Sequence, residues 1–221
     1  LFRSTQKMIM KREILADKGI WTAKKRYILN VHDTEGVRYE KPKLKIMGIE
    51  AVRSSTPSAC REKLKELFNL IMNTDEDTII NFIDGFRKQF KELPAEEVSF
   101  PRQVSDLGKY RDSNSLYTKG TPIHVKGALI HNKLLKDKKL TRNYPLINEG
   151  EKIKFSYLKK PNPTGDTVIA MNNTLPKEFG LDKYIDYDMQ FEKSFIHPVK
   201  LILDTIGWEV ERKSTLESFF G

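Results

Sequence analysis

The period of the hydrophobic pattern changes between Ser54 and Pro57, and this change constrains the fold more than any other feature of the chain. The residues before it are rich in β-branched and aromatic side chains, which favours strands. The expected strands are 8–15, 20–32, 37–39 and 43–50, with a hairpin turn at 33–36 and a break at Gly48. We therefore predict antiparallel strands followed by helices, an α+β fold.

Helical spacing follows Pro57, which we place at the first helical position behind the capping hydroxyls of residues 54–56. Apolar residues at Leu64, Leu67, Phe68 and Ile71 mark this first helix. The remaining expected elements are a helix from Asp75 to Pro94, a short helix near 104–110 in a loop-rich stretch, a basic helix over 124–135, strands over 152–158 and 167–171, and a last helix from Asp182 to Ile206, bent at Pro198 and stopped by Gly207.

Two acidic runs are candidates for metal chemistry. Residues 75–77 (Asp-Glu-Asp) open a helix, where acidic side chains oppose the helix dipole, so we interpret them as structural. Residues 186–188 (Asp-Tyr-Asp) are similar to the metal-binding loop of polymerases, but they lie inside a helical pattern, and a solvated helix face is favoured. Cys60 is the only cysteine, which excludes an internal disulfide. We expect no metal site, no catalytic residue and no cofactor in this chain.

The positive charge is segregated along the chain. Net charge is +9, and residues 1–53 hold 13 Lys and Arg against 6 Asp and Glu, while residues 109–160 hold 13 against 4. The other two stretches are acidic, with 7 against 10 in 54–108 and 6 against 10 in 161–221. Such segregation indicates basic surfaces that converge on one polyanion, although charge alone leaves ribosomal, membrane-surface and nucleic-acid partners open.

Location follows from what the sequence lacks. No apolar run approaches the length that crosses a bilayer, and no leader opens the chain, so we expect a cytoplasmic protein without a membrane partner. The chain starts with Leu1 instead of Met, and we expect a fragment or a processed product.

The candidate nucleic-acid residues form three groups. Lys24-Lys25-Arg26-Tyr27 lies on a predicted strand, where alternating faces let at least two side chains point at a phosphate backbone. Lys43 and Lys45 alternate on a neighbouring strand. Arg53, Ser54 and Ser55 combine a guanidinium, hydroxyls and a helix N-terminus, which all favour phosphate.

An ordered series of motifs resembles the B-family replicative DNA polymerases of tailed bacteriophages (myoviruses). Lys24–Tyr27 is similar to the family's Lys-x-Tyr motif. The matching runs that follow are Lys45–Glu50 and Arg53–Pro57 at the palm-to-thumb junction, Lys109-Tyr110, Pro122–Gly127, Gly165-Asp166, and Phe191–Pro198 in the last thumb helix. The agreement covers nearly the whole chain.

The resemblance implies an architecture and roles for individual residues. Residues 1–53 would be the end of the palm, with antiparallel strands. Residues 54–212 would be a mainly helical thumb with a small β element, and 213–221 a clamp-binding tail. Lys25 and Tyr27 would contact the primer strand, supported by Lys24 and Arg26. Backbone phosphates would be held by Lys43, Lys45, Arg53, Ser54 and Ser55 from the palm side and by Lys119 and Lys126 from the thumb side.

The C-terminal residues Leu216, Phe219 and Phe220 would lie on one face of a helical turn, and the run is similar to the sliding-clamp peptide of these polymerases. Lys213 occupies the usual glutamine position. The alternative is an apolar tail that packs on its own thumb.

Only 23 residues precede Lys24. The resemblance places the metal-binding aspartates, fingers and exonuclease upstream, so we expect Mg²⁺ to serve the parent enzyme and this chain alone to be inactive. Its expected partners are primer–template duplex, the remainder of the polymerase and the clamp. The alternatives are a split-polymerase subunit, a free-standing nucleic-acid-binding module and a ribosome-associated basic protein.

Overall fold

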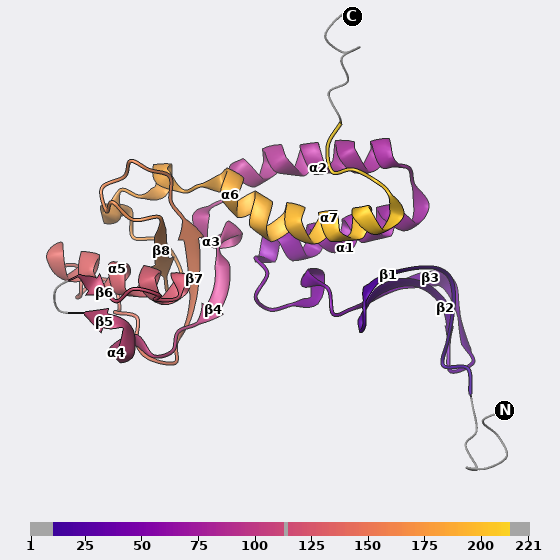
Figure 1. The fold of residues 1–221 in the computed structure, drawn as a ribbon, viewed down its shortest axis with the longest axis horizontal. Coiled ribbons are helices and arrows are strands. Elements are labelled where there is room, and N and C mark those ends of the chain that lie inside the picture. The colour runs from indigo at the N-terminus through magenta and orange to yellow at the C-terminus, as the bar shows by residue number, and fades with distance from the viewer. Residues whose placement is uncertain (1–10, 113–114, 213–221) are drawn as a thin grey trace, which may run out of the picture.

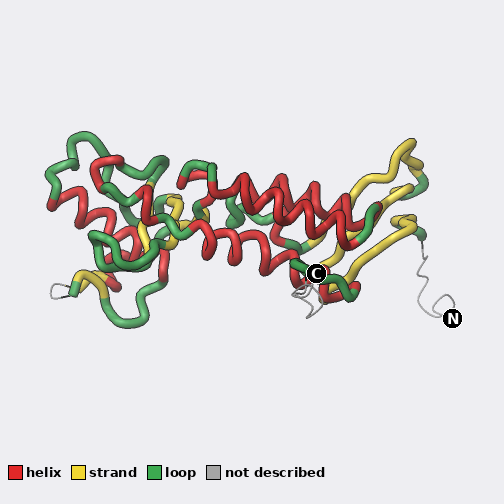
Figure 2. Tube along the Cα trace, turned by 90° about the horizontal axis from the view of Figure 1, so that it is seen from above, coloured by secondary structure: helices red, strands yellow, loops and turns green. Residues whose placement is uncertain are grey.

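The computed structural model describes residues 11–112 and 115–212, and it confirms the α+β class. Three parts follow one another along an elongated molecule: an N-terminal sheet, a layer of long helices, and a mixed unit that we call the distal unit (Figure 1). Seen from above, the long helices lie between the N-terminal sheet and the distal unit (Figure 2). All strand pairs are antiparallel.

The N-terminal sheet has the order β1-β2-β3, with β1 at Ile14–Ala23, β2 at Arg26–Thr34 and β3 at Val37–Met47. The prediction of one strand over 20–32 is wrong, because the chain reverses at Lys24 and Lys25. The stretch from Trp21 to Tyr27 contains no Gly, Asn, Asp or Pro that would announce this turn. The turn predicted at 33–36 is confirmed, and the segments expected at 37–39 and from Lys43 onward belong to the single strand β3, which ends at Met47, directly before the break predicted at Gly48.

The helical layer begins after η1 (Glu50–Val52) with α1 (Ser58–Asn73) and α2 (Glu76–Lys91). The predicted cap of α1 is wrong: Pro57 is its N-cap, and no side chain caps the helix. The Thr56 hydroxyl instead donates to the Glu50 carbonyl at 2.8 Å, which fixes the approach to the helix. Asp75 caps α2 by accepting from the Thr78 N–H at 2.9 Å, so the structural interpretation of this acidic run is confirmed.

The last helical stretch is divided more finely than predicted. It comprises η3 (Asp182–Tyr184), α6 (Tyr187–Phe191), the π-helical turn η4 (Glu192–Ile196) and α7 (His197–Ile206). The irregularity lies just before Pro198, whose ring and missing N–H disfavour a regular helix in the preceding turn. Gly207 ends α7 with φ +76°, as predicted.

The distal unit covers the middle of the chain. Its elements are α3 (Ala95–Val98), β4 (Phe100–Gln103), α4 (Leu107–Tyr110), β5 (Arg111–Asp112), β6 (Leu116–Tyr117), α5 (Ile123–Asp137), β7 (Lys152–Tyr157), β8 (Val168–Met171) and η2 (Lys177–Phe179). Sheet order is β4-β7-β8, and α5 packs on β8. Gly127 permits this contact, because a side chain there would meet the Ala170 backbone. The predicted α5, β7 and β8 are confirmed within two residues at each end.

Two hydrophobic clusters hold the molecule together. The first joins the inner face of the N-terminal sheet, through Ile20 and Ile28, to α1, α2 and α7, and it includes buried Cys60. The second fills the distal unit between α5 and its sheet. The first cluster therefore crosses the boundary predicted at residue 53, because apolar faces on both sides of it pack together. Tyr187 packs against both clusters. The palm and thumb assignments themselves stay predictions.

The long helices form the top of an arch in Figure 1, and the N-terminal sheet and the distal unit hang below them at either end. The connection from β3 to α1 and the strand β4 lie on the lower side of this arch. None of the described helices is long and apolar enough to cross a membrane.

Candidate nucleic-acid interface

The turn between β1 and β2 carries two exposed lysines, Lys24 and Lys25. Lys25 adopts φ +62°, a left-handed conformation that is uncommon for residues other than glycine. The predicted alternation of these side chains along a strand is wrong, but the turn still presents both ammonium groups outward. Both lysines lack an ion-pair partner among the described residues.

Gly48 holds this turn against the end of β3. It has φ +66°, and a side chain at this position would collide with the Lys25 carbonyl oxygen. The absence of a side chain therefore allows the β1–β2 turn and the exit of β3 to pack backbone against backbone. Two stretches that are separated by more than 20 residues are fixed side by side in this way.

An arginine pair shares one carboxylate beside the turn. Nη2 of Arg26 lies 2.9 and 3.1 Å from the two carboxylate oxygens of Glu50, and Nη1 of Arg53 lies 3.2 Å from one of them. Arg26 and Glu50 are largely buried, whereas the Arg53 side chain is 48% exposed. Arg53 also donates to the Gly48 carbonyl at 3.2 Å. Arg26 thus stabilises the fold, and Arg53 is the member of the pair that can reach a ligand.

The outer face of the N-terminal sheet combines cations with apolar side chains. Leu44 and Ile46 pack against the helical core, so alternation places Lys43 and Lys45 on the opposite face. Tyr27 lies on this outer face between Trp21 on β1 and Met47 on β3, which are 60% and 42% exposed. The ammonium of Lys43 lies 4.1 Å from the centre of the Tyr39 ring. The predicted neighbouring positions of Lys43 and Lys45 are confirmed.

Ser54 and Ser55 line a hollow of about 280 Å³ between the β3–α1 connection and the distal unit. The opposite wall comprises Arg102 on β4 and Lys152 on β7, with Pro101 and Gln103. The Arg102 guanidinium also lies 3.4 Å from the Ser55 carbonyl oxygen. Two hydroxyls that face a guanidinium and an ammonium form a surface that suits a phosphate group.

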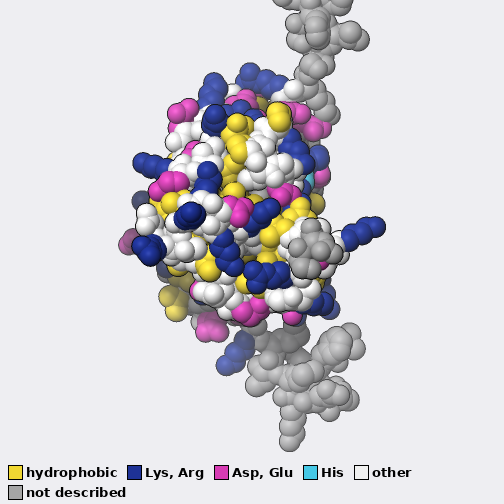
Figure 3. Space-filling model, turned by 90° about the vertical axis from the view of Figure 1, so that its left-hand side faces the viewer, with side chains coloured by type: hydrophobic (Ala, Val, Ile, Leu, Met, Phe, Trp, Pro, Cys, Tyr) yellow, Lys and Arg dark blue, Asp and Glu magenta, His cyan; other side chains and the backbone are white. Residues whose placement is uncertain are grey.

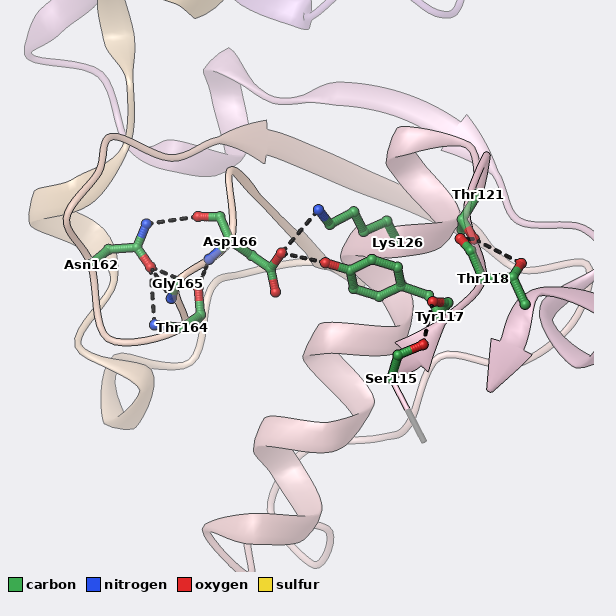
Figure 4. A network of polar contacts seen from close by, with 9 residues as sticks. All are labelled: Ser115, Tyr117, Thr118, Thr121, Lys126, Asn162, Thr164, Gly165 and Asp166. Atoms are coloured by element: carbon green, nitrogen blue, oxygen red, sulfur yellow. Dashed lines mark hydrogen bonds and ion pairs between the residues drawn. The ribbon is translucent and has the colours of Figure 1, made fainter. Parts of the chain in front are cut away.

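The two predicted thumb lysines differ in their surroundings. Lys119 is exposed in the turn before α5. Lys126 lies in a network with Asp166 and Tyr117: its ammonium is 2.9 Å from Asp166 Oδ1, to which the Tyr117 hydroxyl also donates, at 2.6 Å (Figure 4). Partial burial opposes the charge of Lys126, yet bonds to Tyr117 and Asp166 raise its pKa. Burial and then the Asp166 bond raise the pKa of Tyr117.

The loop that supplies Asp166 is held by its own side chains. The Asn162 amide oxygen accepts from the backbone N–H of Thr164 and Gly165, and its amide nitrogen donates to the Asp166 carbonyl at 2.7 Å (Figure 4). These bonds hold the Asp166 carboxylate toward Lys126 on α5. The charge of Lys126 is neutralised within the protein, while Lys119 remains available to solvent.

Ion pairing differs between several cations on the long helices and five cations on the lower side of the arch. On α1 and α7, Lys63, Lys65 and Lys200 pair with acidic residues three or four positions away, at 2.8–3.1 Å. Along the lower side, no ion pair is formed within the described part of the chain by Lys24, Lys25, Lys45, Arg102 or Lys152. This uncompensated charge lies along the β1–β2 turn, the outer sheet face and the hollow at Ser54.

The Asp186-Tyr187-Asp188 run makes structural contacts at the start of α6, whereas the sequence pattern placed it inside a longer helix. Asp186 caps α6 by accepting from the Met189 N–H at 3.0 Å. Asp188 lies 2.7 Å from the ammonium of Lys91 and 3.4 Å from that of Lys159. The hydrogen bond from Lys91, with smaller effects from its charge and from Lys159, lowers the pKa of Asp188. Residues 11–112 and 115–212 contain no cluster of three or more His, Cys, Asp or Glu that could hold a metal ion.

Comparison with known proteins identifies the family of this chain. The chain is 34% identical over 207 residues to a DNA-directed DNA polymerase of Enterobacteria phage T4, a match that covers 92% of this chain and 22% of the phage protein. It is also 34% identical over 226 residues to a DNA-directed DNA polymerase of Escherichia phage RB69, with coverage of 96% and 24%. This chain belongs to the B-family phage DNA polymerases. No protein-family model matches it.

As a polymerase segment, the chain spans about a quarter of the length of these curated relatives. The resemblance drawn from its ordered motifs is confirmed. The predicted clamp residues Leu216, Phe219 and Phe220 lie outside the described residues.

Sequence reasoning missed several residues of this candidate surface. Arg102 and Lys152 were not among the predicted site residues, because each lies in a short strand that is far in sequence from Ser54. Trp21 was placed in a strand, yet its exposure could not be inferred from the alternating pattern. Large exposed apolar side chains mark interaction sites. The exposure of Trp21 beside basic residues is known only from the structure.

Proposed function

We propose that this chain is the duplex-gripping segment of a phage replicative DNA polymerase and that the lower side of the arch holds the primer–template phosphates. The uncompensated cations support this proposal most directly, because phosphate neutralisation by Lys and Arg provides most sequence-independent affinity for DNA. Because the relatives are DNA-directed DNA polymerases, we take the polyanion to be duplex DNA. In this proposal Lys24, Lys25, Lys45 and Arg53 contact backbone phosphates, and Tyr27 lies against the primer strand.

The hollow at Ser54 extends the proposed contact from the N-terminal sheet to the distal unit. Arg102 and Lys152 face Ser54 and Ser55 across it, so a phosphate held there would touch both parts of the molecule. Lys43 on the N-terminal sheet and Lys119 on the distal unit would add contacts at the two ends of this surface. Contacts of this kind position the duplex without reading its sequence, as replication requires.

A fluorescence anisotropy titration with labelled primer–template duplex at two salt concentrations tests the proposal. The double variant Lys24→Glu/Lys25→Glu should weaken binding at least tenfold. Its matched control, Lys63→Glu/Lys65→Glu on α1, changes net charge equally at side chains that already have partners, and should weaken binding less than threefold. Equal losses in both variants would refute a localised surface. A plain duplex that binds as tightly as a primer–template junction would favour a ribosome-associated or general basic protein.

Nucleotide addition is assigned to the remainder of the parent polymerase, with Mg²⁺ held there by carboxylates. The described residues of this chain offer no carboxylate cluster for that metal. Primer-extension assays of the purified chain with Mg²⁺ and dNTPs should show no product. Extended primer would overturn this assignment.

Other polymerase regions are the second proposed partner, and the N-terminal sheet offers them a surface. Leu15 and Trp21 on β1, and Val37 and Met47 on β3, are between 42% and 65% exposed. Burial of Trp21 by a co-purified upstream segment should shift its fluorescence to shorter wavelength, and a Trp208→Phe background would assign the signal to Trp21. An unchanged spectrum in a stable complex would place the contact elsewhere.

The tail is proposed to bind a sliding clamp through Leu216, Phe219 and Phe220. The support is the spacing of one aliphatic and two aromatic residues. A Phe219→Ala/Phe220→Ala variant should lose clamp binding in a pull-down with the purified phage clamp while it retains duplex affinity. Retained clamp binding would exclude this tail.

A further inference from the structure

A second surface lies at the free end of the distal unit, where α5 ends. A pocket of about 350 Å³ opens there between α4, the β5–β6 pair and the last turns of α5. Its floor is aliphatic, and includes Leu107, Leu116, Leu129, Leu146 and Ile147. Figure 3 looks at this end of the molecule, where yellow hydrophobic side chains lie among dark blue Lys and Arg. Pockets of this size accept one or two large side chains or a small ligand.

The rim of the pocket is basic. Arg111, Lys133 and Lys136 line it, and Lys136 also lines an adjoining hollow with Lys139 and Arg142. Within the described part of the chain, none of these five cations forms an ion pair. These five cations therefore lack ion pairs, as do the cations on the lower side of the arch, although they lie on different elements.

The carboxylates at the pocket offset part of this positive charge, and the lining remains net positive by one charge. Glu149 is already occupied, because its two carboxylate oxygens accept from the backbone N–H groups of Asp106 and Leu107 at 2.6 and 2.8 Å. Asn132 is bonded to both the N–H and the carbonyl of Ile147, at 2.8 Å each. Asp137 is the second carboxylate of the lining, so three cations stand against two carboxylates.

The lining distinguishes between two kinds of polyanion. Nucleic-acid sites that take an unpaired base present aromatic rings on which it stacks, and no aromatic side chain lines this pocket. An aliphatic floor instead suits an apolar peptide side chain, and a ring of lysines and arginine suits carboxylates on either side of that anchor.

We propose that this pocket docks an acidic peptide segment of a partner protein, with one or two large apolar anchor residues in the aliphatic floor and flanking Asp or Glu against Arg111, Lys133 and Lys136. The geometry resembles other grooves in which apolar anchors provide affinity and charges provide orientation and partner choice. This contact is independent of the duplex surface, which uses other residues.

Fluorescence anisotropy of the full chain with a labelled synthetic peptide tests the inference. The peptide carries one phenylalanine and one leucine a helical turn apart, with Asp and Glu at the other positions. Saturable binding is expected, and Lys133→Glu/Lys136→Glu should weaken it at least tenfold. Lys63→Glu/Lys65→Glu, with the same change in net charge, should leave it within threefold. The double variant should retain primer–template affinity within threefold.

Two further probes decide between occupants. A peptide in which both anchors are alanine should bind at least tenfold more weakly, because the floor then contributes nothing, and Leu146→Asp should weaken the anchored peptide similarly. Equal binding of the two peptides would overturn the proposal in favour of plain charge attraction. A single-stranded oligonucleotide that binds more tightly than the anchored peptide, and whose binding is lost in Lys133→Glu/Lys136→Glu, would overturn the proposal in favour of nucleic acid.

Thermal unfolding curves confirm that each variant is folded. The variant Lys133→Gln/Lys136→Gln repeats the test by removing the two charges without reversing them.

Discussion

Nη2 of Arg26 lies within hydrogen-bonding distance of both carboxylate oxygens of Glu50, at 2.9 and 3.1 Å, and this contact joins the start of β2 to the turn after β3. Arg53 approaches the same carboxylate at 3.2 Å, so Glu50 neutralises part of the charge next to the proposed duplex surface. Glu50 therefore has two opposed effects, since it stabilises the fold and reduces the attraction for phosphate.

Glu50→Gln should separate these two effects. We expect duplex affinity to rise about threefold, because Arg53 becomes free to bind phosphate. The free energy of unfolding should fall by about 1–2 kcal/mol, because largely buried Arg26 loses its charged partner. Duplex titration and urea denaturation measure the two quantities. Glu62→Gln, which faces exposed Lys65 on α1, is the control and should change neither. A Glu50→Gln variant with reduced affinity would contradict the assigned role.

Gly48→Ala should destabilise the N-terminal sheet by about 2 kcal/mol or more, because it adds a steric collision with the Lys25 carbonyl to the strain of a positive φ. Gly36→Ala is a matched control, since Gly36 has φ +89° but nothing within 4 Å of the added carbon. Urea denaturation of both variants isolates the contact. Equal destabilisation would show that the packing of the turn against β3 contributes little.

Arg102→Ala and Lys152→Ala test the hollow that joins the two parts of the molecule. Each should weaken duplex binding to all sequences alike and reduce the slope of log affinity against log salt by about 1. Lys200→Ala, at a cation already paired with Asp204, should leave the slope unchanged. An unchanged slope in both hollow variants would remove the hollow from the duplex surface.

Lys126→Met tests whether the predicted thumb contact is a structural one. The variant keeps an unbranched apolar side chain but leaves Asp166 and Tyr117 without the ammonium, so we expect a loss of about 1–3 kcal/mol in the free energy of unfolding. Duplex affinity should change less than twofold, because the lysine charge is already neutralised by Asp166. The exposed Lys119→Met is the comparison and should lose affinity without losing stability. The reverse pattern would make Lys126 the duplex contact.

Stability should fall as the pH drops below about 6.5, the ordinary histidine pKa. Burial lowers the pKa of His131 in the folded chain, and burial with the nearby Arg102 charge lowers that of His124. Since the unfolded state then binds protons first, the stability present above pH 6.5 is lost as the pH falls toward the lowered values, by up to about 1.4 kcal/mol per pH unit for each group.

His131→Phe should flatten this profile between pH 7 and pH 5, because the residue packs on Phe179 with ring centres 5.4 Å apart and a phenyl ring retains that contact. Urea denaturation across the pH range gives the comparison. A profile for His131→Phe that matches the parent chain would assign the acid sensitivity to other groups.

Much of the fold was predictable because it is encoded in contiguous residues. The helical spacing from Leu64 to Ile71, the acidic first turn at Asp75 and the stop at Gly207 each express a local preference that tertiary packing did not override. The turn at Lys24-Lys25 was missed because it uses no turn-forming residue, and the contact with Gly48 that accommodates it comes from another strand.

By itself the sequence determined the α+β class, the order of elements, the segregated charge and the ordered motifs that place the chain among the phage polymerases. Only the tertiary structure decided which cations are exposed without an ion-pair partner. Ser55 meets Arg102 across 47 residues of chain, and this contact closes a hollow that suits phosphate. Asp166, which Tyr117 meets across 49 residues, neutralises Lys126. Periodicity and capping act within a turn or a strand, whereas the exposure and partners of a charge depend on which distant surfaces pack together.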